Sequence, residues 1–382
     1  MPTLTDPVAT ARSLAGLIDA QAADGDAAGT MTRPVVDALS DTGLFGLLVP
    51  RQLGGAEADA PTTLAVFEEL SRADGSTGWS FLANACTTAF AAAYTGDEAV
   101  AAMFGGARPV VHAGMLGPRG EAKRVDGGYL VHGRYSFGSG CGHADWIGAG
   151  TLVTANGEFV TGPSGLPELR VAFVPRSQVT FLGNWDVLGL SGTGSFDYEL
   201  PEQFVDEAFT FPLTAPVVHR GGPVYHLGVL VLTAVAHAGF ALGVGRRAME
   251  EIARMARTKT RMGAATPIGD QQLFLHDFAF QDAALRAARA YTFEVFGDAQ
   301  ATVDAGAELS VEQTQRARQT ATYATRAVTE VVRFAYSWAA TDALRPSPLQ
   351  RCFRDIHAAT QHIFVDNSTL TAATPVLLDS YR

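Results

Sequence analysis

The spacing of hydrophobic and polar residues divides the chain into three parts. Over the first hundred residues the apolar positions recur with a helical period, as in residues 33–39. Residues 61–70 resemble a helix with proline in its first turn. The glycine-containing residues 73–78 predict a break, after which another apolar helix runs to Ala93. We therefore predict a helical domain over residues 1–108.

The pattern changes to short alternating or β-rich runs from about residue 110. Residues 129–135, 171–174 and 179–182 are examples. Asp126-Gly-Gly is typical of a hairpin turn, and Asn156-Gly marks another turn. These signals predict a central β domain over residues 109–214.

Helical spacing returns after Gly222-Pro223 and continues to the end of the chain. Breaks near residues 263–269, 297–306 and 345–348 divide this part into four long helices. The sequence thus predicts an α+β chain that ends in a four-helix bundle over residues 215–382. A cleft where the layers meet is the expected place for a ligand.

One stretch of the predicted bundle is apolar over nearly its whole length. Residues 227–245 have His237 as their only strongly polar member and approach the length of a membrane span. Since the flanking segments are amphipathic, we expect a buried bundle helix and no membrane association. Residues 243–248 satisfy a loose dinucleotide-binding pattern, but they follow no strand. We interpret Gly243 and its neighbouring glycine as close-packing positions.

Composition excludes several classes of function. The 382 residues are 47% hydrophobic with a formal net charge of -11, so we expect no nucleic-acid partner. Lys123 and Lys259 are the only lysines, and neither stands in a Gly-Lys-Ser/Thr phosphate loop or a Ser-x-x-Lys motif. No Gly-x-Ser-x-Gly sequence is found either. ATP-driven and serine-hydrolase chemistry are therefore disfavoured.

Cysteine usage indicates a reducing compartment. Cys86, Cys141 and Cys352 are far apart and odd in number, which argues against a disulfide framework and a zinc site. We expect no bound metal. The first residues lack the basic and apolar runs of an export signal. These features together predict a cytoplasmic protein.

Several local sequences resemble one protein family. They are residues 49–55, 67–79, 125–140, 143–146, 185–195 and 206–212. They are similar to segments of the acyl-CoA dehydrogenases and of their flavin-dependent monooxygenase relatives, over nearly the whole chain. The resemblance implies the fold of that superfamily, whose segment order agrees with the one predicted above.

The resemblance also implies a flavin site. In the relatives the turn that matches residues 137–141 lies against the isoalloxazine, so Phe137, Ser139, Gly140 and Cys141 become candidates for cofactor binding. Ser139 is the candidate hydroxyl beside flavin N5, where short polar groups on a glycine-permitted turn can approach the ring edge. Without the flanking matches, an ordinary hairpin tip would be the simpler interpretation.

A second cofactor contact is implied near the start of the bundle. Arg261 and Gln272 match a family segment in which an arginine meets flavin phosphate and a glutamine meets the cofactor, partly across a subunit boundary. The intervening residues depart from the usual family sequence. A solvated helix end is therefore the alternative interpretation of Arg261.

The last predicted helix indicates the branch of the family. Acyl-CoA dehydrogenases need a carboxylate base, yet no glutamate lies between Glu330 and Arg382. Arg354-Asp355 is followed by His362 at a spacing similar to that of the monooxygenases, which makes His362, together with Ser139, a candidate catalytic residue. A satisfied core or interface histidine is the alternative.

Three further residues complete these expectations. If the helix continues, Asp366 lies one turn after His362 and could orient its imidazole. His112 and Met115, in a segment closer to the hydroxylases than to the dehydrogenases, are candidate substrate contacts, although a plain strand residue is the alternative for His112. Glu250 and Glu251 remain conceivable bases for a dehydrogenase.

The combined prediction is the oxygenase of a two-component flavin-dependent monooxygenase. Reduced FMN or FAD would come from a separate NAD(P)H flavin reductase, because the chain has no credible nicotinamide site. Dioxygen would form a C4a-hydroperoxyflavin that hydroxylates an aromatic or heterocyclic small molecule. The resemblance further implies a homo-oligomer, tetramer or dimer. An FAD-dependent acyl-thioester dehydrogenase and a non-catalytic homologue are the alternatives.

Overall fold

The computed structural model describes residues 4–106, 108–162 and 165–382. Its first part is helical, with α1 (Pro7–Ser13), α2 (Ala15–Ala28), α3 (Arg33–Asp41), α4 (Ala60–Ala73), α5 (Gly75–Tyr94) and α6 (Asp97–Phe104). Asp59 and Asp74 cap α4 and α5, each accepting a hydrogen bond from a backbone amide of the first turn. The helices predicted at residues 33–39 and 61–70 are thus confirmed.

The predicted break at residues 73–78 is wrong in its extent. Only Asp74 interrupts the helices, and Gly75 already begins α5. A Cβ atom at Gly78 would lie 2.6 Å from the Ser71 Cα and 2.7 Å from its Cβ. The glycine therefore allows α4 and α5 to approach closely, and it does not end a helix.

The central part forms one eight-stranded sheet in the order β6-β7-β2-β1-β3-β5-β8, with β4 paired to β3. The strands are β1 (His112–Val125), β2 (Gly128–Gly138), β3 (Trp146–Ala155), β4 (Glu158–Phe159), β5 (Leu169–Pro175), β6 (Thr180–Phe181), β7 (Phe196–Asp206) and β8 (Thr210–Pro212). The predicted hairpin at Asp126-Gly127 joins β1 to β2. β1 and β3 run parallel, and the other pairs are antiparallel.

The C-terminal part differs from the four long helices expected. Three long helices are present, α7 (Gly228–Ala256), α8 (Gln272–Asp304) and α9 (Val311–Ala339). The fourth is divided into α10 (Pro348–Ala359) and α11 (Asn367–Asp379). Side-chain caps make this division, because the His362 ring accepts from the Phe364 amide and Asp366 accepts from the Ser368 amide. α8 also runs through Gly297, where a break was expected.

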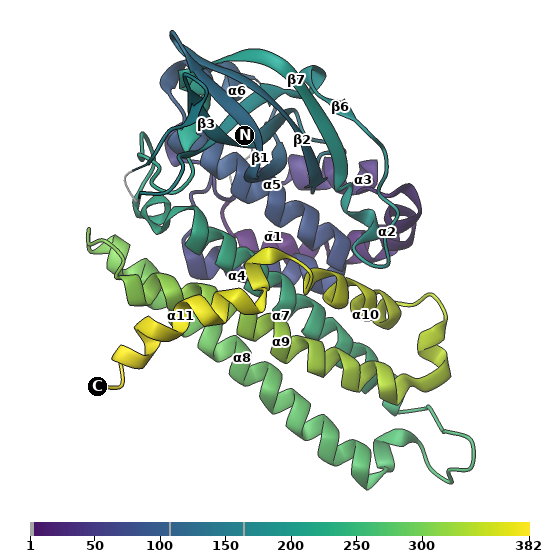
Figure 1. Ribbon diagram of the computed structural model, residues 1–382. Coiled ribbons are helices and arrows are strands. Elements are labelled where there is room, and N and C mark those ends of the chain that lie inside the picture. The colour runs from purple at the N-terminus through teal and green to yellow at the C-terminus, as the bar shows by residue number, and fades with distance from the viewer. Residues whose placement is uncertain (1–3, 107, 163–164) are drawn as a thin grey trace.

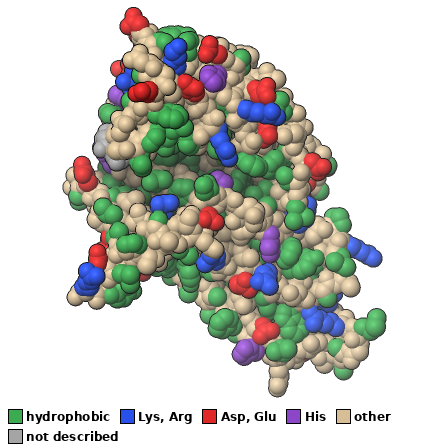
Figure 2. All heavy atoms as spheres, viewed as in Figure 1, with side chains coloured by type: hydrophobic (Ala, Val, Ile, Leu, Met, Phe, Trp, Pro, Cys, Tyr) green, Lys and Arg blue, Asp and Glu red, His purple; other side chains and the backbone are tan. Residues whose placement is uncertain are grey.

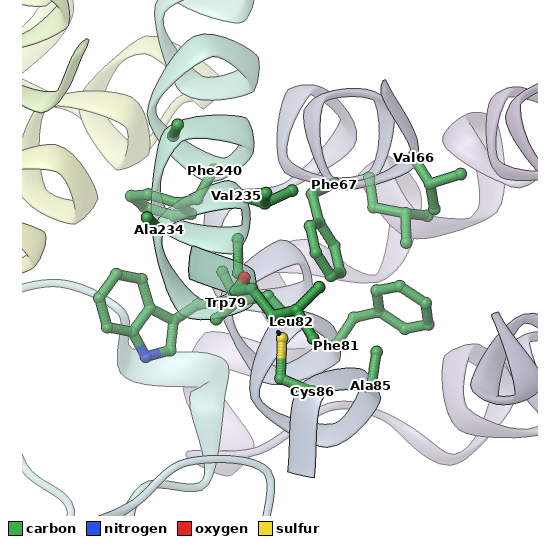
Figure 3. Packing of buried hydrophobic residues seen from close by; sticks show 14 of the residues in the cluster. Val66, Phe67, Trp79, Phe81, Leu82, Ala85, Cys86, Ala234, Val235 and Phe240 are labelled. Carbon is green, nitrogen blue, oxygen red and sulfur yellow. Dashed lines mark hydrogen bonds between the residues drawn. The ribbon is translucent and has the colours of Figure 1, made fainter. Parts of the chain in front are cut away.

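The three parts pack in sequence. The sheet lies at one end of the molecule, the C-terminal helices lie at the other, and α4 and α5 lie between them (Figure 1). The most apolar part of the helical segment 223–256, which includes α7, is 78% buried, as expected for a core helix. Phe67 of α4, Phe81 of α5 and Val235 of α7 meet in this core (Figure 3). The Trp79 indole, also on α5, is directed away from Phe81. The α+β fold class is confirmed.

Candidate active site

The turn that follows β2 presents an exposed aromatic ring. Phe137 has φ +65°, a left-handed conformation that is rare outside glycine, and 57% of its surface is exposed. The Asp197 carboxylate accepts a hydrogen bond from the Phe137 amide at 3.2 Å. The ring of Trp185 packs edge to face on that of Phe137, with 6.2 Å between the ring centroids. A strained backbone that holds a large apolar side chain in the open is typical of a ligand-contacting turn.

Gly140 and Cys141 anchor the far end of this turn. Gly140 has φ +75° and packs against Asn84 of α5. Cys141 is buried, so its thiol cannot touch a ligand directly, and burial raises its pKa to about 12. Its carbonyl accepts a hydrogen bond from Arg176. Of the residues predicted to bind the cofactor in this turn, Cys141 can therefore offer a ligand only its backbone.

Ser139 sits at the head of a chain of hydrogen bonds. Its hydroxyl accepts from the indole Nε1 of Trp79 at 3.1 Å and lies 2.8 Å from the Ser195 hydroxyl. Ser195 lies 2.7 Å from the Thr193 hydroxyl, which donates to the Leu190 carbonyl at 2.8 Å. Ser195 and Thr193 are buried, whereas Ser139 is partly exposed. Neither Ser195 nor Thr193 was predicted from the sequence as a site residue.

The loop that carries this chain is held by a buried carboxylate. Leu190 has φ +59°, and its amide donates to Asp355 of α10 at 2.7 Å. Burial, followed by the nearby Asp74, raises the pKa of Asp355 to about 8. Arg354, the other member of the Arg-Asp pair, binds Asp26 of α2 at 3.1 Å. Asp355 therefore joins the loop of Leu190 to α10, and Arg354 joins α10 to α2.

His362 lies in the turn between α10 and α11. Its Nδ1 accepts from the Phe364 amide at 3.2 Å, so Nδ1 carries no hydrogen and the neutral ring must carry it on Nε2. Burial lowers the pKa of His362 to about 4, which keeps the ring neutral near pH 7. The expectation for Asp366 is wrong, because the helix ends before it and its carboxylate caps α11.

A second histidine, which the sequence analysis did not assign, lies beside His362. His237 of α7 is buried, and its ring centroid is 4.5 Å from that of His362. Phe364 stacks on His237 at 5.4 Å. Burial, and then the neighbouring His362, holds the pKa of His237 well below its usual value. A single polar residue in the apolar stretch 227–245 was the signal that could have identified it.

Trp79 connects the two candidate catalytic residues. Its Nε1 donates to Ser139, and its ring centroid is 5.7 Å from that of His362 and 4.9 Å from that of Phe240. Figure 3 shows the indole directed away from the core around Phe81. Figure 2 shows a hollow between the sheet and the C-terminal helices in which hydrophobic side chains gather. The arrangement offers a largely apolar site with a few oriented polar groups.

Arg261 and Gln272 do not lie near the turn of Ser139 in this chain. They flank the loop between α7 and α8, at the end of the bundle far from the sheet (Figure 1). Arg261 donates to the carbonyls of Ser337 and Trp338 at 2.9 and 3.1 Å, and Gln272 is exposed at the start of α8. The structure therefore does not bring these two predicted cofactor contacts together with Ser139 within one chain.

The two candidate substrate contacts differ in accessibility. His112 is fully buried, with its Nε2 3.2 Å from the Met103 sulfur and its ring against Phe104 and Phe173. The prediction that it contacts substrate is corrected to the alternative, a strand residue of the core, and burial lowers its pKa to about 3. Met115 is partly exposed, and its amide donates to the Tyr198 hydroxyl at 2.9 Å.

Other arrangements of reactive groups are poorly supported. Within residues 4–106, 108–162 and 165–382, no cluster of three or more histidine, cysteine or acidic residues could hold a metal ion. Glu250 pairs with Arg72 and Arg246, at 3.1 and 3.2 Å. Glu251 pairs with Arg247 at 2.9 Å. Because arginines hold both carboxylates as ion pairs, neither is poised as a dehydrogenase base.

Comparison with known proteins identifies similar chains. Residues 9–104 match the family "Acyl-CoA dehydrogenase, N-terminal domain", and residues 235–367 match "Acyl-CoA dehydrogenase, C-terminal domain". The chain is 33% identical to an indole-3-acetate monooxygenase of Pseudomonas putida, over 89% of this chain and 85% of that protein.

Two further similarities are to a monooxygenase subunit and to a solved hydroxylase structure. The chain is 30% identical to a flavin-dependent monooxygenase, oxygenase subunit HsaA, of Rhodococcus jostii, over 85% of each chain. The crystal structure of 3-HSA hydroxylase from Rhodococcus sp. RHA1 superposes with a TM-score of 0.90 at 25% identity. That superposition covers 98% of this chain and 97% of the hydroxylase.

Proposed function

The chain belongs to the acyl-CoA dehydrogenase superfamily, in its branch of flavin-dependent monooxygenases, and we propose that it is the oxygenase component of a two-component system. Its substrate is an aromatic or heterocyclic small molecule, which receives one oxygen atom from dioxygen. A separate NAD(P)H flavin reductase supplies the reduced flavin. The relatives named above, two of them monooxygenases by name, support this proposal.

Reduced FMN or FAD fits the site around Ser139. The exposed ring of Phe137 offers an aromatic contact, and the partly exposed Ser139 hydroxyl offers a polar one at the edge of the turn. Gly140 shapes the turn. When bound, the reduced flavin supplies the electrons that activate dioxygen.

His362 acts in this proposal as a hydrogen-bond donor. Its Nδ1 is occupied by the Phe364 amide, so its Nε2–H is the group left to face a ligand. A donor in a water-poor site stabilises an oxygen atom that gains negative charge during reaction. Of the two roles open to the histidine, this geometry favours assistance to oxygen activation over removal of a substrate proton, because a neutral Nε2–H cannot accept one.

The observation that carries the proposal is that Ser139 and His362 both contact Trp79. These residues come from the β2 turn and from the break between α10 and α11, more than two hundred residues apart in the chain. Their convergence on one indole, which also packs against the ring of Phe240, supports an apolar site with a few oriented polar groups, as a flavin-dependent oxygenase requires.

The test is hydroxylation with chemically reduced flavin, isotope-labelled dioxygen and an aromatic probe. Indole-3-acetate, the substrate in the name of the Pseudomonas putida relative, is the first probe. His362→Asn keeps an acceptor near Nδ1 but removes the Nε2–H, and we expect it to lower the rate by roughly 100-fold or more. His357→Ala, a matched control on α10, should retain activity. Undiminished labelled product from His362→Asn would contradict the role of His362.

We further propose a cytoplasmic homo-oligomer, a tetramer or dimer. α8 exposes Leu273 and Phe280 at 65% and 67%, and their spacing of seven residues puts both on one helix face, which another copy could cover. Such packing would allow Arg261 and Gln272 of one copy to reach the cofactor of another. Light scattering of the purified chain measures the state, and a monomer that still binds flavin would contradict this part of the proposal.

A further inference from the structure

The hydrogen-bond chain behind Ser139 has one possible direction. Three oxygen–oxygen contacts join Ser139, Ser195, Thr193 and the Leu190 carbonyl, at 2.8, 2.7 and 2.8 Å. Each contact needs one hydrogen between its two oxygen atoms, since facing lone pairs repel. The three hydroxyls carry exactly as many hydrogens as there are contacts, and the carbonyl can only accept.

The assignment of these hydrogens follows from the carbonyl end. Thr193 must donate to the Leu190 carbonyl, so Ser195 must donate to Thr193. Ser139 is then left to donate to Ser195. The Leu190 carbonyl is fixed in place, because its residue is held at the amide by Asp355 and its carbonyl also accepts from the Trp185 indole at 3.1 Å.

The Ser139 oxygen has one position left for a ligand. Its hydrogen points to Ser195, and one lone pair accepts the Trp79 Nε1–H. The remaining lone pair can only accept a hydrogen bond. A partner that donates is therefore favoured there, and a partner that presents a lone pair is repelled.

We propose that Ser195 and Thr193 are positioning residues that make Ser139 an acceptor and thereby select reduced flavin over oxidised flavin. Reduced flavin carries a hydrogen on N5, whereas oxidised flavin has a lone pair there. This inference rests on the proposed function and on the placement of Ser139 beside flavin N5, which the family resemblance implies. It assigns the selectivity to two buried hydroxyls that touch no part of the flavin.

Removing either hydroxyl frees the Ser139 hydrogen. In Ser195→Ala the Ser139 hydroxyl has no acceptor and can turn toward the flavin. In Thr193→Val, Ser195 loses its acceptor and can donate to Ser139 instead, which reverses the chain. Both variants should then accept oxidised flavin more readily.

The experiment measures dissociation constants of the full-length protein for oxidised and for dithionite-reduced FMN and FAD, by fluorescence or absorbance under anaerobic conditions. We expect the ratio of the oxidised to the reduced constant to fall roughly tenfold in Ser195→Ala and in Thr193→Val, the size of one hydrogen-bond preference. Thr193→Ser keeps the hydroxyl and should restore the wild-type ratio.

Ser191→Ala is the matched control, because Ser191 lies in the same loop and bonds to the Val187 carbonyl at 3.3 Å, outside the chain. A ratio unchanged in both Ser195→Ala and Thr193→Val overturns the inference, as does a Thr193→Ser variant that behaves like Thr193→Val. If the wild-type protein hydroxylates its substrate but both variants have the wild-type ratio of dissociation constants, only this inference is refuted. Wild-type protein that binds neither flavin state would refute the proposed function itself.

Discussion

Replacing Gly140 by alanine tests how tightly the turn proposed to face the flavin is built. Gly140 has φ +75°, and a Cβ atom there would lie 2.5 Å from the Asn84 Nδ2 and 2.7 Å from its Oδ1. Asn84 cannot move aside freely, because it donates to the His112 carbonyl at 2.9 Å and bonds the His143 Nε2 at 2.8 Å. The added methyl group must therefore displace either the turn or this buried amide.

Gly127 provides the matched control for the backbone conformation. It has φ +72° in the β1–β2 hairpin, and nothing lies within 4 Å of its Cβ position. A left-handed alanine costs roughly 1–2 kcal/mol, offset by about 0.4–1 kcal/mol from the stiffer unfolded chain. Gly140→Ala adds about 1–3 kcal/mol of overpacking and about 1 kcal/mol for each Asn84 hydrogen bond lost. We expect unfolding free energy to fall by about 1 kcal/mol in Gly127→Ala and about 3–5 kcal/mol in Gly140→Ala.

Urea unfolding followed by circular dichroism measures both losses, and anaerobic titration measures the affinity for reduced flavin. Gly140→Ala should weaken flavin binding, whereas Gly127→Ala, at the opposite end of β2, should leave it unchanged. Equal stability of the two variants would show that Asn84 yields easily. The claim that it fixes the turn would then be refuted.

Two further predictions concern packing and buried charge. Gly243→Ala places a Cβ 2.7 Å from the Arg72 amide and should lower Tm. Gly297→Ala has nothing within 4 Å of its Cβ and should raise Tm slightly. The reverse order of Tm in thermal scans would refute the close-packing interpretation of Gly243. The pKa of Asp355 is about 8 in the folded protein and near 4 in an unfolded chain, so the folded state binds the proton of this carboxyl more tightly. The stability that this proton contributes is fully present below pH 4 and is lost as pH rises toward 8. Asp355→Asn, which can still accept from the Leu190 amide, should therefore gain Tm relative to wild type between pH 5 and pH 9, and parallel pH profiles would disprove the burial argument.

Local patterns predicted most of the elements, because helix and strand periods are properties of neighbouring residues. The failures occurred where a distant residue decides the structure. Gly78 resembles a helix breaker in the sequence but is required by the approach of Ser71 on another helix. The division between α10 and α11 contains no glycine or proline, since the caps formed by His362 and Asp366 make it. Such caps have no strong sequence signature in a helical context.

The candidate site was predictable in part for the same reason. Phe137 and Ser139 lie in one short turn whose sequence resembles a known family, so local comparison identified them. Ser195 follows β2 by more than fifty residues, and only the pairing of β2 with β7 brings its hydroxyl to Ser139. His237 lies beside His362 only because α7 packs against α10, the first part of the divided fourth helix. Neither neighbour could be assigned without the tertiary structure.

Ser139 and His362, the two polar groups proposed to face the cofactor, owe their hydrogen-bonding roles to the main chain. A carbonyl can only accept, so Leu190 orients the hydroxyl chain that leaves Ser139 as an acceptor. An amide can only donate, so Phe364 leaves His362 with its hydrogen on Nε2. Backbone groups do not titrate, and the pKa of about 4 keeps His362 neutral above pH 5. The candidate site therefore presents one fixed acceptor at Ser139 and one fixed donor at His362, and this pairing should persist across the physiological pH range.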